Sequence, residues 1–138
     1  MSLYRRINGR LAVSPQIYVN DVAGIAAAGY KTIVCNRPDK EDTSQPSFSD
    51  IEREARKYNL RTHWQPVYAN AISDVQGHDF GMLLKTLPVP ILAYCRSGMR
   101  CIMLLALSEA NERPIKDIVS DAARAGYDIS GLIPRLKL

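Results

Sequence analysis

Hydrophobic and polar positions divide this chain into two kinds of segment. Apolar and β-branched residues form short runs at 31–35 and 89–94, which are typical of buried strands. Elsewhere apolar residues recur three and four positions apart, as at Phe80, Leu83 and Leu87, which indicates amphipathic helices. Strands that alternate with helices predict a mostly parallel sheet with helices on both faces. We therefore expect an α/β fold with three layers, αβα.

Capping residues predict where several helices begin. Ser47 and Ser73 each precede a helical pattern and have a polar partner three residues later, Asp50 and Gln76, as in a capping box. The apolar run at 102–107 has no polar face, so we expect a central helix packed inside the domain. The remaining predicted elements are strands at 11–13 and 61–67, helices starting at Asn20 and Pro114, and a short helical turn after Asp128.

Composition and length place the chain among ordinary globular proteins. Its 138 residues suit one domain, 1–138, built around a single core. Hydrophobic residues make up 46% and charged residues 23% of the chain, and the longest apolar run has six residues, too few to cross a bilayer. The N-terminal residues include no apolar stretch typical of a secretion signal. We expect a cytoplasmic protein with no membrane partner.

Charge and cysteine content narrow the possible partners. The net charge of +4 favours small anionic molecules, but the basic residues are scattered, so we expect no nucleic-acid partner. Cys35, Cys95 and Cys101 are an odd number of cysteines, which suits a reducing compartment. The two histidines are fifteen residues apart and no C-x-x-C pair is present. We therefore expect neither a metal nor a cofactor.

The stretch AYCRSGMRC, residues 93–101, is the strongest candidate for chemistry. It lies between the predicted strand at 89–94 and the central helix. Such a junction leaves backbone N–H groups unpaired, with the positive end of the helix dipole behind them, and so binds anions. A cysteine there is stabilised as its thiolate, with a pKa of roughly 3.5–7.5. We therefore expect Cys95 to be a nucleophile.

The rest of this loop supplies the candidate residues for binding an anionic substrate. Gly98 allows a tight turn, and Arg100 offers a fork of donors to an oxyanion. Arg96 can attract the anion, Ser97 can hold the thiolate or a leaving sulfur, and Met99 can form a pocket wall. The alternative is a buried cysteine at a strand end, a turn glycine and solvated arginines.

Three further residues each have two interpretations. Arg37 follows the strand at 31–35 and either lines the same pocket, since ligands collect beyond the carboxyl ends of parallel strands, or is a solvated loop residue. Cys101 is either a core cysteine or a resolving thiol for oxidised Cys95. Asp74 is either a catalytic acid or simply a first-turn helix residue.

Four segments together resemble a known family. They are AYCRSGMRC, TIVCNRPDKED from residue 32, HWQPV from residue 63 and AGYDIS from residue 125. They resemble the beta-lactamase-hydrolase-like, phosphatase-like domain family of bacteria, some of whose members are labelled sulfur transferases. The resemblance implies a cysteine-phosphatase-like fold of the dual-specificity type, with Cys95 as nucleophile and the backbone of 96–100 as anion cradle.

The loop is one residue shorter than the pattern of tyrosine-phosphatase-like enzymes. Those enzymes carry C-x5-R, whereas Arg100 makes this loop C-x4-R and position 101 is a cysteine. The shorter spacing resembles that of many single-domain rhodaneses. One residue fewer narrows the loop by up to about 3.5 Å of backbone, which favours sulfur over a phosphoryl group.

The catalytic acid of a phosphatase is also missing from its expected place. The pattern would put an acid just after the strand ending near Val67, where this chain has Tyr68, Ala69 and Asn70. Asp74 is the nearest carboxylate and the candidate acid in a phosphatase. Sulfur transfer between thiols and persulfides needs no such acid, because a low-pKa sulfur leaves by itself.

These observations lead to one preferred hypothesis and two alternatives. The preferred hypothesis is a sulfurtransferase that moves a sulfane sulfur from thiosulfate or a low-molecular-weight persulfide to an acceptor thiol through a Cys95 persulfide. The first alternative is a phosphatase that acts through a Cys95 phosphocysteine on a phosphate ester. The second is a non-catalytic module that binds anions or senses oxidation. The expected setting is a larger sulfide-handling protein or pathway.

Overall fold

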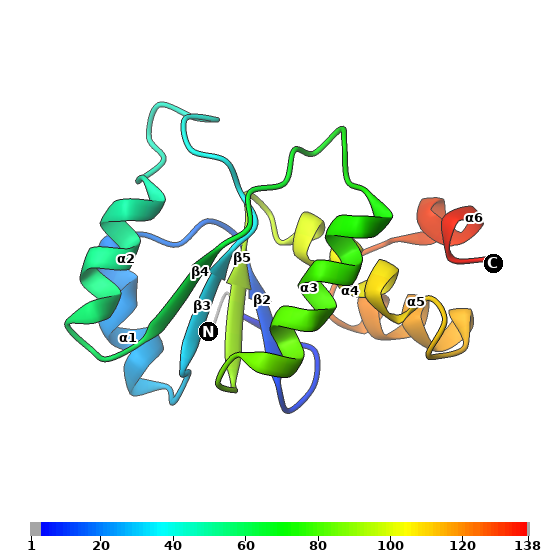
Figure 1. Cartoon of the computed structure of the whole chain (residues 1–138), viewed down its shortest axis with the longest axis horizontal. Coiled ribbons are helices and arrows are strands. Elements are labelled where there is room, and N and C mark those ends of the chain that lie inside the picture. The colour runs from blue at the N-terminus through cyan, green and yellow to red at the C-terminus, as the bar shows by residue number, and fades with distance from the viewer. Residues whose placement is uncertain (1–3, 138) are drawn as a thin grey trace.

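A five-stranded sheet with the strand order β1-β2-β5-β3-β4 forms the centre of the fold (Figure 1). The computed structural model describes residues 4–137. The strands are β1 (Arg5–Arg6), β2 (Leu11–Ser14), β3 (Thr32–Cys35), β4 (Arg61–Trp64) and β5 (Ile91–Tyr94). The helices are η1 (Val19–Asp21), α1 (Val22–Ala27), α2 (Phe48–Arg56), α3 (Asp74–Thr86), α4 (Met99–Glu109), α5 (Ile115–Arg124), η2 (Ser130–Leu132) and α6 (Ile133–Leu136).

Four of the five strands are parallel, which brings their carboxyl ends to one edge of the sheet. β5 pairs with β2 on one side and with β3 on the other, and β3 pairs with β4, all in parallel. β1 pairs with β2 in the antiparallel direction, and the sequence pattern did not predict it. β4 ends at Trp64 rather than Val67. Beyond it the Gln65 and Val67 N–H groups donate to Cys35 O and Asn36 O respectively, which breaks the regular two-residue step of the ladder.

Helices cover both faces of the sheet, as the alternating pattern predicts. α1 and α2 lie on one face, whereas α3 and α4 lie on the other, with α5 and α6 beyond α4 (Figure 1). Each face has its own apolar cluster, one including Ile33, Ile51 and Leu92 and the other including Phe80 and Leu104. The three-layer αβα prediction is confirmed, and α4 is the buried central helix that its apolar run predicts.

The predicted caps are correct for two helices and shifted for two others. The Ser47 hydroxyl accepts the Asp50 N–H at 3.1 Å, and Ser73 forms a full capping box with Gln76. Asn20, in contrast, lies inside the turn η1, because the Asp21 carboxylate accepts the Tyr18 N–H and starts the turn earlier. Pro114 has an extended ψ of 137°, so α5 begins one residue later than predicted.

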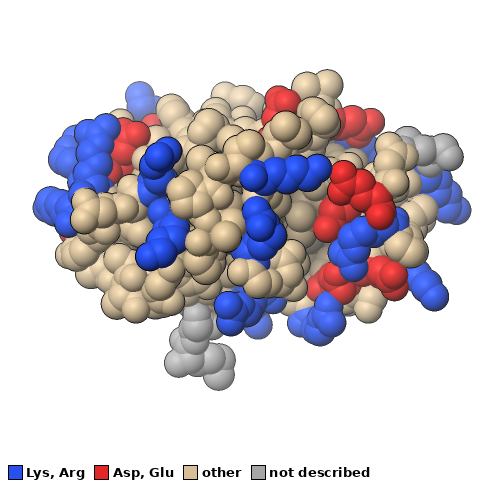
Figure 2. Space-filling model, turned by 60° about the horizontal axis from the view of Figure 1, so that its bottom comes forward, with Lys and Arg blue, Asp and Glu red and all other residues tan. Residues whose placement is uncertain are grey.

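The loops that follow the parallel strands gather at one end of the molecule. In Figure 1 the loops after β3 and β4 rise at the top, near the turn from β5 into α4. Figure 2 turns the opposite end forward and shows basic side chains scattered among acidic ones. Among residues 4–137, no helix has the length and apolar character needed to span a membrane. The same residues contain no cluster of three or more His, Cys, Asp or Glu side chains suited to a metal ion.

Candidate active site

Cys95 is the first residue after β5 and lies at the carboxyl end of the sheet. Its N–H donates at 3.4 Å to the carbonyl oxygen of Ser14, the last residue of β2, so the loop begins beside the end of β2. Its sulfur accepts the Gly98 N–H at 3.1 Å, and the N–H groups of Arg100 and Cys101 also point at it. The cysteine sulfur therefore lies among backbone N–H groups at the start of α4, the arrangement expected of an anion-binding loop.

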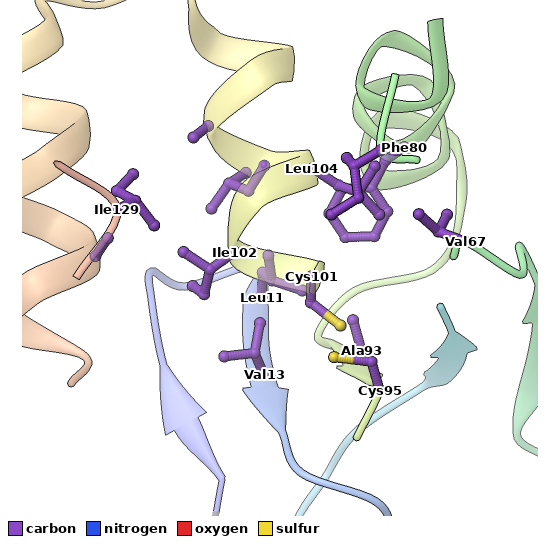
Figure 3. Close-up of a cluster of buried hydrophobic side chains, with 14 of the residues drawn as sticks. Leu11, Val13, Val67, Phe80, Ala93, Cys95, Cys101, Ile102, Leu104 and Ile129 are labelled. Carbon is purple, nitrogen blue, oxygen red and sulfur yellow. The ribbon is translucent and has the colours of Figure 1, made fainter. Parts of the chain in front are cut away.

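These donors lower the pKa of Cys95. The Cys101 thiol has the largest effect, and the N–H groups of Cys101, Gly98 and Arg100 add to it, bringing the pKa to about 6 although the residue is only 1% exposed. Burial, followed by the hydrogen bond to Cys95, raises the pKa of Cys101 well above its usual range. Figure 3 shows the two sulfur atoms facing each other at the start of α4. These contacts favour the thiolate form at Cys95 and the protonated form at Cys101.

The loop is fixed from two sides. The Gln16 N–H donates to Arg96 O at 3.1 Å, and the Tyr127 hydroxyl donates to Ser97 O at 2.9 Å. Gly98 has a φ of +98°, and a Cβ on it would lie 2.2 Å from the Tyr127 oxygen. Glycine is therefore required at this position both for its backbone conformation and for the close approach of Tyr127.

Arg100 lies in the first turn of α4 and directs its guanidinium toward two neighbouring loops. Its Nη1 donates to Glu41 Oε2 at 3.0 Å and to Val67 O at 2.8 Å, while Nη2 donates to Glu41 Oε1 at 2.8 Å. Glu41 thus takes the bidentate position that an oxyanion would occupy on this fork. The Arg100 guanidinium, followed by that of Arg37, holds the pKa of the Glu41 carboxyl below its usual range.

Arg37 lies in the same ionic group as Arg100. Its side chain is 2% exposed, so the interpretation as a solvated loop arginine is wrong. Its Nε donates to Glu41 Oε1 at 2.8 Å and its Nη1 to Gln16 Oε1 at 2.8 Å. Nη2 is buried without a hydrogen-bond partner among the described residues. The loop after β3 therefore delivers both Arg37 and Glu41 to the edge of the Cys95 loop.

The other predicted substrate-binding residues lie around this loop with different exposure. Arg96 is exposed. Hydrogen bonds from Ser44 are the main cause of the lowered pKa of the Asp42 carboxyl, and the positive charge of Arg96 lowers it further. The Ser97 hydroxyl accepts the Met99 N–H at 3.2 Å. The Met99 side chain is half-buried and packs against the apolar cluster around α4, as a wall residue does.

Asp74 and Cys35 have surroundings unlike those of Cys95. Asp74 is 76% exposed in the first turn of α3, and its carboxylate accepts Arg135 Nη2 at 2.8 Å. Cys35 ends β3 and packs in the apolar cluster on the α1 and α2 face of the sheet. Burial raises the pKa of Cys35 to about 11.

Three contributors to this site were not predicted from the sequence. Glu41, Tyr127 and Gln16 contact Arg100, Ser97 and Arg37 respectively. Glu41 had a usable signal, because it follows Arg37 by four residues in a polar segment beyond a buried strand. For Tyr127 and Gln16 the sequence offers no such pattern, because neither is near the Cys95 loop along the chain.

Most of the chain matches one family of known proteins. Residues 3–112 match the family described as beta-lactamase hydrolase-like protein, phosphatase-like domain. A beta-lactamase hydrolase-like protein from Xylella fastidiosa strain Temecula1 is 33% identical over 133 residues, which are 95% of this chain and 31% of that protein. This chain therefore spans less than a third of the length of that relative.

Solved structures show the same relationship in three dimensions. The crystal structure of a candidate phosphatase from Neisseria meningitidis Z2491 is 36% identical, has a TM-score of 0.88, and covers 99% of this chain and 96% of its own. The active form of Tk-PTP has a TM-score of 0.74 at 15% identity, covering 97% of this chain and 92% of its own, which shows the fold alone. The fold is that of the cysteine phosphatases, and the chain belongs to the family of beta-lactamase hydrolase-like protein, phosphatase-like domains.

Proposed function

We propose that this protein is a cysteine-dependent phosphatase that hydrolyses phosphate monoesters through a Cys95 phosphocysteine. The observation that carries the proposal is the Cys95 thiolate, held by backbone N–H groups at the start of α4 in a cysteine-phosphatase fold. A thiolate in a bowl of donors combines a nucleophile with a site for the anion that it attacks. The 36% identical candidate phosphatase from Neisseria supports the same chemistry over the whole chain.

The reaction consists of two displacements at phosphorus. Cys95 Sγ attacks the phosphorus, a sulfur–phosphorus bond forms, and the ester bond to the leaving oxygen breaks as that oxygen gains a proton. Water then attacks the phosphocysteine, inorganic phosphate leaves, and the thiolate is restored. The N–H groups of the loop and the Arg100 fork stabilise the negative charge on the phosphoryl oxygens, and exposed Arg96 attracts the substrate.

The preference for phosphate reverses the hypothesis drawn from the loop length. That hypothesis counted residues between Cys95 and Arg100 as if all of them formed an open loop. In the structure α4 begins at Met99, so only residues 96–98 form the open loop. Arg100 extends its side chain from the first turn of the helix, and its reach does not depend on the loop length alone. The spacing C-x4-R therefore does not by itself exclude a phosphoryl group.

Sulfur transfer is a second candidate function, favoured by one specific contact. Cys101 places a thiol against the Cys95 sulfur, where a persulfide sulfur can be held or handed on. In this reaction Cys95 takes the outer sulfur of thiosulfate, releases sulfite, and yields the sulfur to an acceptor thiol. No proton donor for an alkoxide is needed, which is compatible with the lack of an acid at 68–70.

Parallel assays distinguish the two candidates. We expect the wild type to hydrolyse 4-nitrophenyl phosphate and Cys95→Ser to lose at least about a thousandfold in kcat/KM, whereas Cys35→Ser stays within about threefold. Mass spectrometry of rapidly quenched protein should detect phosphate on Cys95. A Cys95 persulfide after thiosulfate treatment, without ester hydrolysis, would support the sulfurtransferase instead. If neither reaction occurs, the module that only binds anions or senses oxidation is favoured.

A further inference from the structure

Hydrolysis of an ordinary phosphate ester requires a proton for the leaving oxygen. A phenoxide or alkoxide is a poor leaving group unless a nearby acid protonates it as the bond breaks. The loop after β4 offers Tyr68, Ala69 and Asn70, and Asp74 is paired with Arg135 at the exposed start of α3. The carboxylate that contacts the Arg100 fork is Glu41, from the loop after β3.

We propose that Glu41 is the proton donor of this site, and that the substrate phosphate prepares it for this role by taking its place on Arg100. The role rests on the proposed phosphatase function. In the free protein the Glu41 carboxylate occupies the two donor positions of the Arg100 guanidinium, as an anion supplied by the protein itself. The bound substrate replaces that anion with its own oxygens and leaves a carboxyl group beside the ester bond.

The contacts of Glu41 identify which oxygen is free to act. Oε1 accepts Arg37 Nε at 2.8 Å and Arg100 Nη2 at 2.8 Å, so Arg37 can keep this oxygen in place after Arg100 turns to the substrate. Oε2 accepts Arg100 Nη1 at 3.0 Å, and this is the contact that a phosphate would take over. The Glu41 side chain is 23% exposed, so it also borders the solvent from which the substrate arrives.

The charges around the site favour a proton on Glu41 once phosphate is bound. In the free protein the guanidinium groups of Arg37 and Arg100 balance the Glu41 carboxylate and the Cys95 thiolate. A phosphate dianion adds two negative charges beside that carboxylate and removes one of its two cationic partners. A like charge nearby raises the pKa of a carboxyl group, so the phosphate that releases Glu41 also favours its protonated form.

The proton then follows a balanced path through both displacements. As Cys95 Sγ bonds to phosphorus and the ester bond breaks, the Glu41 proton moves to the leaving oxygen. The resulting carboxylate accepts a proton from the water that attacks the phosphocysteine, and the sulfur–phosphorus bond breaks. Glu41 is thus protonated again while phosphate is bound, and it gives this proton to the solvent when phosphate leaves and it pairs with Arg100 again.

The test compares two substrates that differ in their need for the acid. Phenyl phosphate releases a basic phenoxide, with a phenol pKa of about 10, whereas 2,4-dinitrophenyl phosphate releases a far weaker base. We expect Glu41→Gln to lower kcat for phenyl phosphate by about a hundredfold or more and to change it less than about threefold for the dinitrophenyl ester. Glu41→Asp, which keeps a transferable proton, should recover part of the loss.

A matched control comes from the same loop. Asp42→Asn removes the neighbouring exposed carboxylate and should leave hydrolysis of both esters unchanged within about twofold. Circular dichroism of each variant reports folding. For the wild type, kcat for phenyl phosphate should fall on the alkaline side as Glu41 loses its proton, and this fall should be absent for the dinitrophenyl ester.

The outcomes separate this role from simpler ones. Equal losses on both esters in Glu41→Gln would mean that Glu41 only positions Arg100, and a gain on both would mean that it only blocks the anion site. Either result overturns the proposal. A wild type that hydrolyses neither ester overturns the phosphatase function itself and this role with it.

Discussion

Cys35 ends β3 and Cys95 directly follows the neighbouring strand β5; both are almost fully buried, yet their thiols have opposite pKa shifts. Cys35 directly precedes the loop that carries Glu41, and Cys95 begins the short loop that leads into α4. Burial raises the pKa of Cys35 to about 11. The pKa of Cys95 falls to about 6 because the Cys101 thiol and three backbone N–H groups outweigh the same kind of burial.

The difference shows that burial alone does not decide whether a cysteine is reactive. The Cys35 sulfur lies in an apolar cluster and donates to Arg37 O at 3.3 Å. Burial raises the pKa of this thiol and outweighs the hydrogen bonds with the Tyr94 side chain and the Arg37 backbone, which lower it. The Cys95 sulfur accepts hydrogen bonds at the start of a helix, and these favour the thiolate. Reactivity at this edge of the sheet therefore follows from whether the hydrogen-bond donors around a thiol outweigh its burial.

Selective alkylation provides the largest expected contrast. At pH 7 a thiol of pKa about 6 is about nine-tenths thiolate, whereas a thiol of pKa about 11 is ionised in about one molecule in ten thousand. Because a thiolate of lower pKa is also a weaker nucleophile, iodoacetamide should modify Cys95 roughly thirtyfold to a hundredfold faster than Cys35. Peptide mass spectrometry over a pH series should show the Cys95 rate rising through pH 6 and then levelling. Faster labelling of Cys35 would contradict the comparison.

Gly98→Ala should reduce the pKa difference between Cys95 and Cys35, because it moves the N–H of residue 98 away from the Cys95 sulfur. The new Cβ would lie 2.2 Å from the Tyr127 oxygen on a backbone with φ of +98°, so the loop has to shift. We expect the midpoint of Cys95 alkylation to rise by about one to two pH units. Gly29→Ala is the matched control, because Gly29 has a φ of +97° but nothing within 4 Å of a Cβ. An unchanged Cys95 midpoint in Gly98→Ala would argue against the role of the Gly98 N–H.

Cys101→Ala should reduce the pKa difference between Cys95 and Cys35 by removing only the Cys101 thiol. The loss of its thiol donor leaves the backbone donors in place, so the Cys95 midpoint should rise by about one pH unit. Cys101→Ser keeps a donor at this position and should shift the midpoint less than alanine does. Equal shifts in the two variants would show that packing, rather than the hydrogen bond, supports the thiolate.

Tyr127→Phe should have the smallest effect. It keeps the ring over Gly98 and removes the hydrogen bond to Ser97 O, worth about 1 kcal/mol. We expect a threefold to tenfold loss of kcat/KM, roughly the rate equivalent of that energy, with little change in the Cys95 midpoint. Steady-state kinetics on 4-nitrophenyl phosphate measures the first quantity and alkylation the second. A large shift of the midpoint would mean that Tyr127 acts on the thiolate rather than on the position of the loop.

Much of the fold could be predicted from the local pattern of residues. The buried strands, the caps at Ser47 and Ser73 and the buried helix α4 all follow from periodicity and capping chemistry. The boundary at Val67 was wrong by three residues because the chain leaves the regular β3 register after Trp64, and the boundary at Pro114 was wrong by one residue because Pro114 is extended and only precedes α5. The short strand β1 has no apolar alternation and was not predicted.

The sequence by itself determined the Cys95 loop, because its donors belong to residues within six positions of the cysteine and a strand followed by a helix directs their N–H groups inward. Only the tertiary structure decided what surrounds that loop. Glu41 meets Arg100 across 59 residues of chain, and Tyr127 meets Ser97 across 30. Backbone donors next to a cysteine follow from local geometry, whereas ion pairs between loops depend on where the parallel strands bring those loops together.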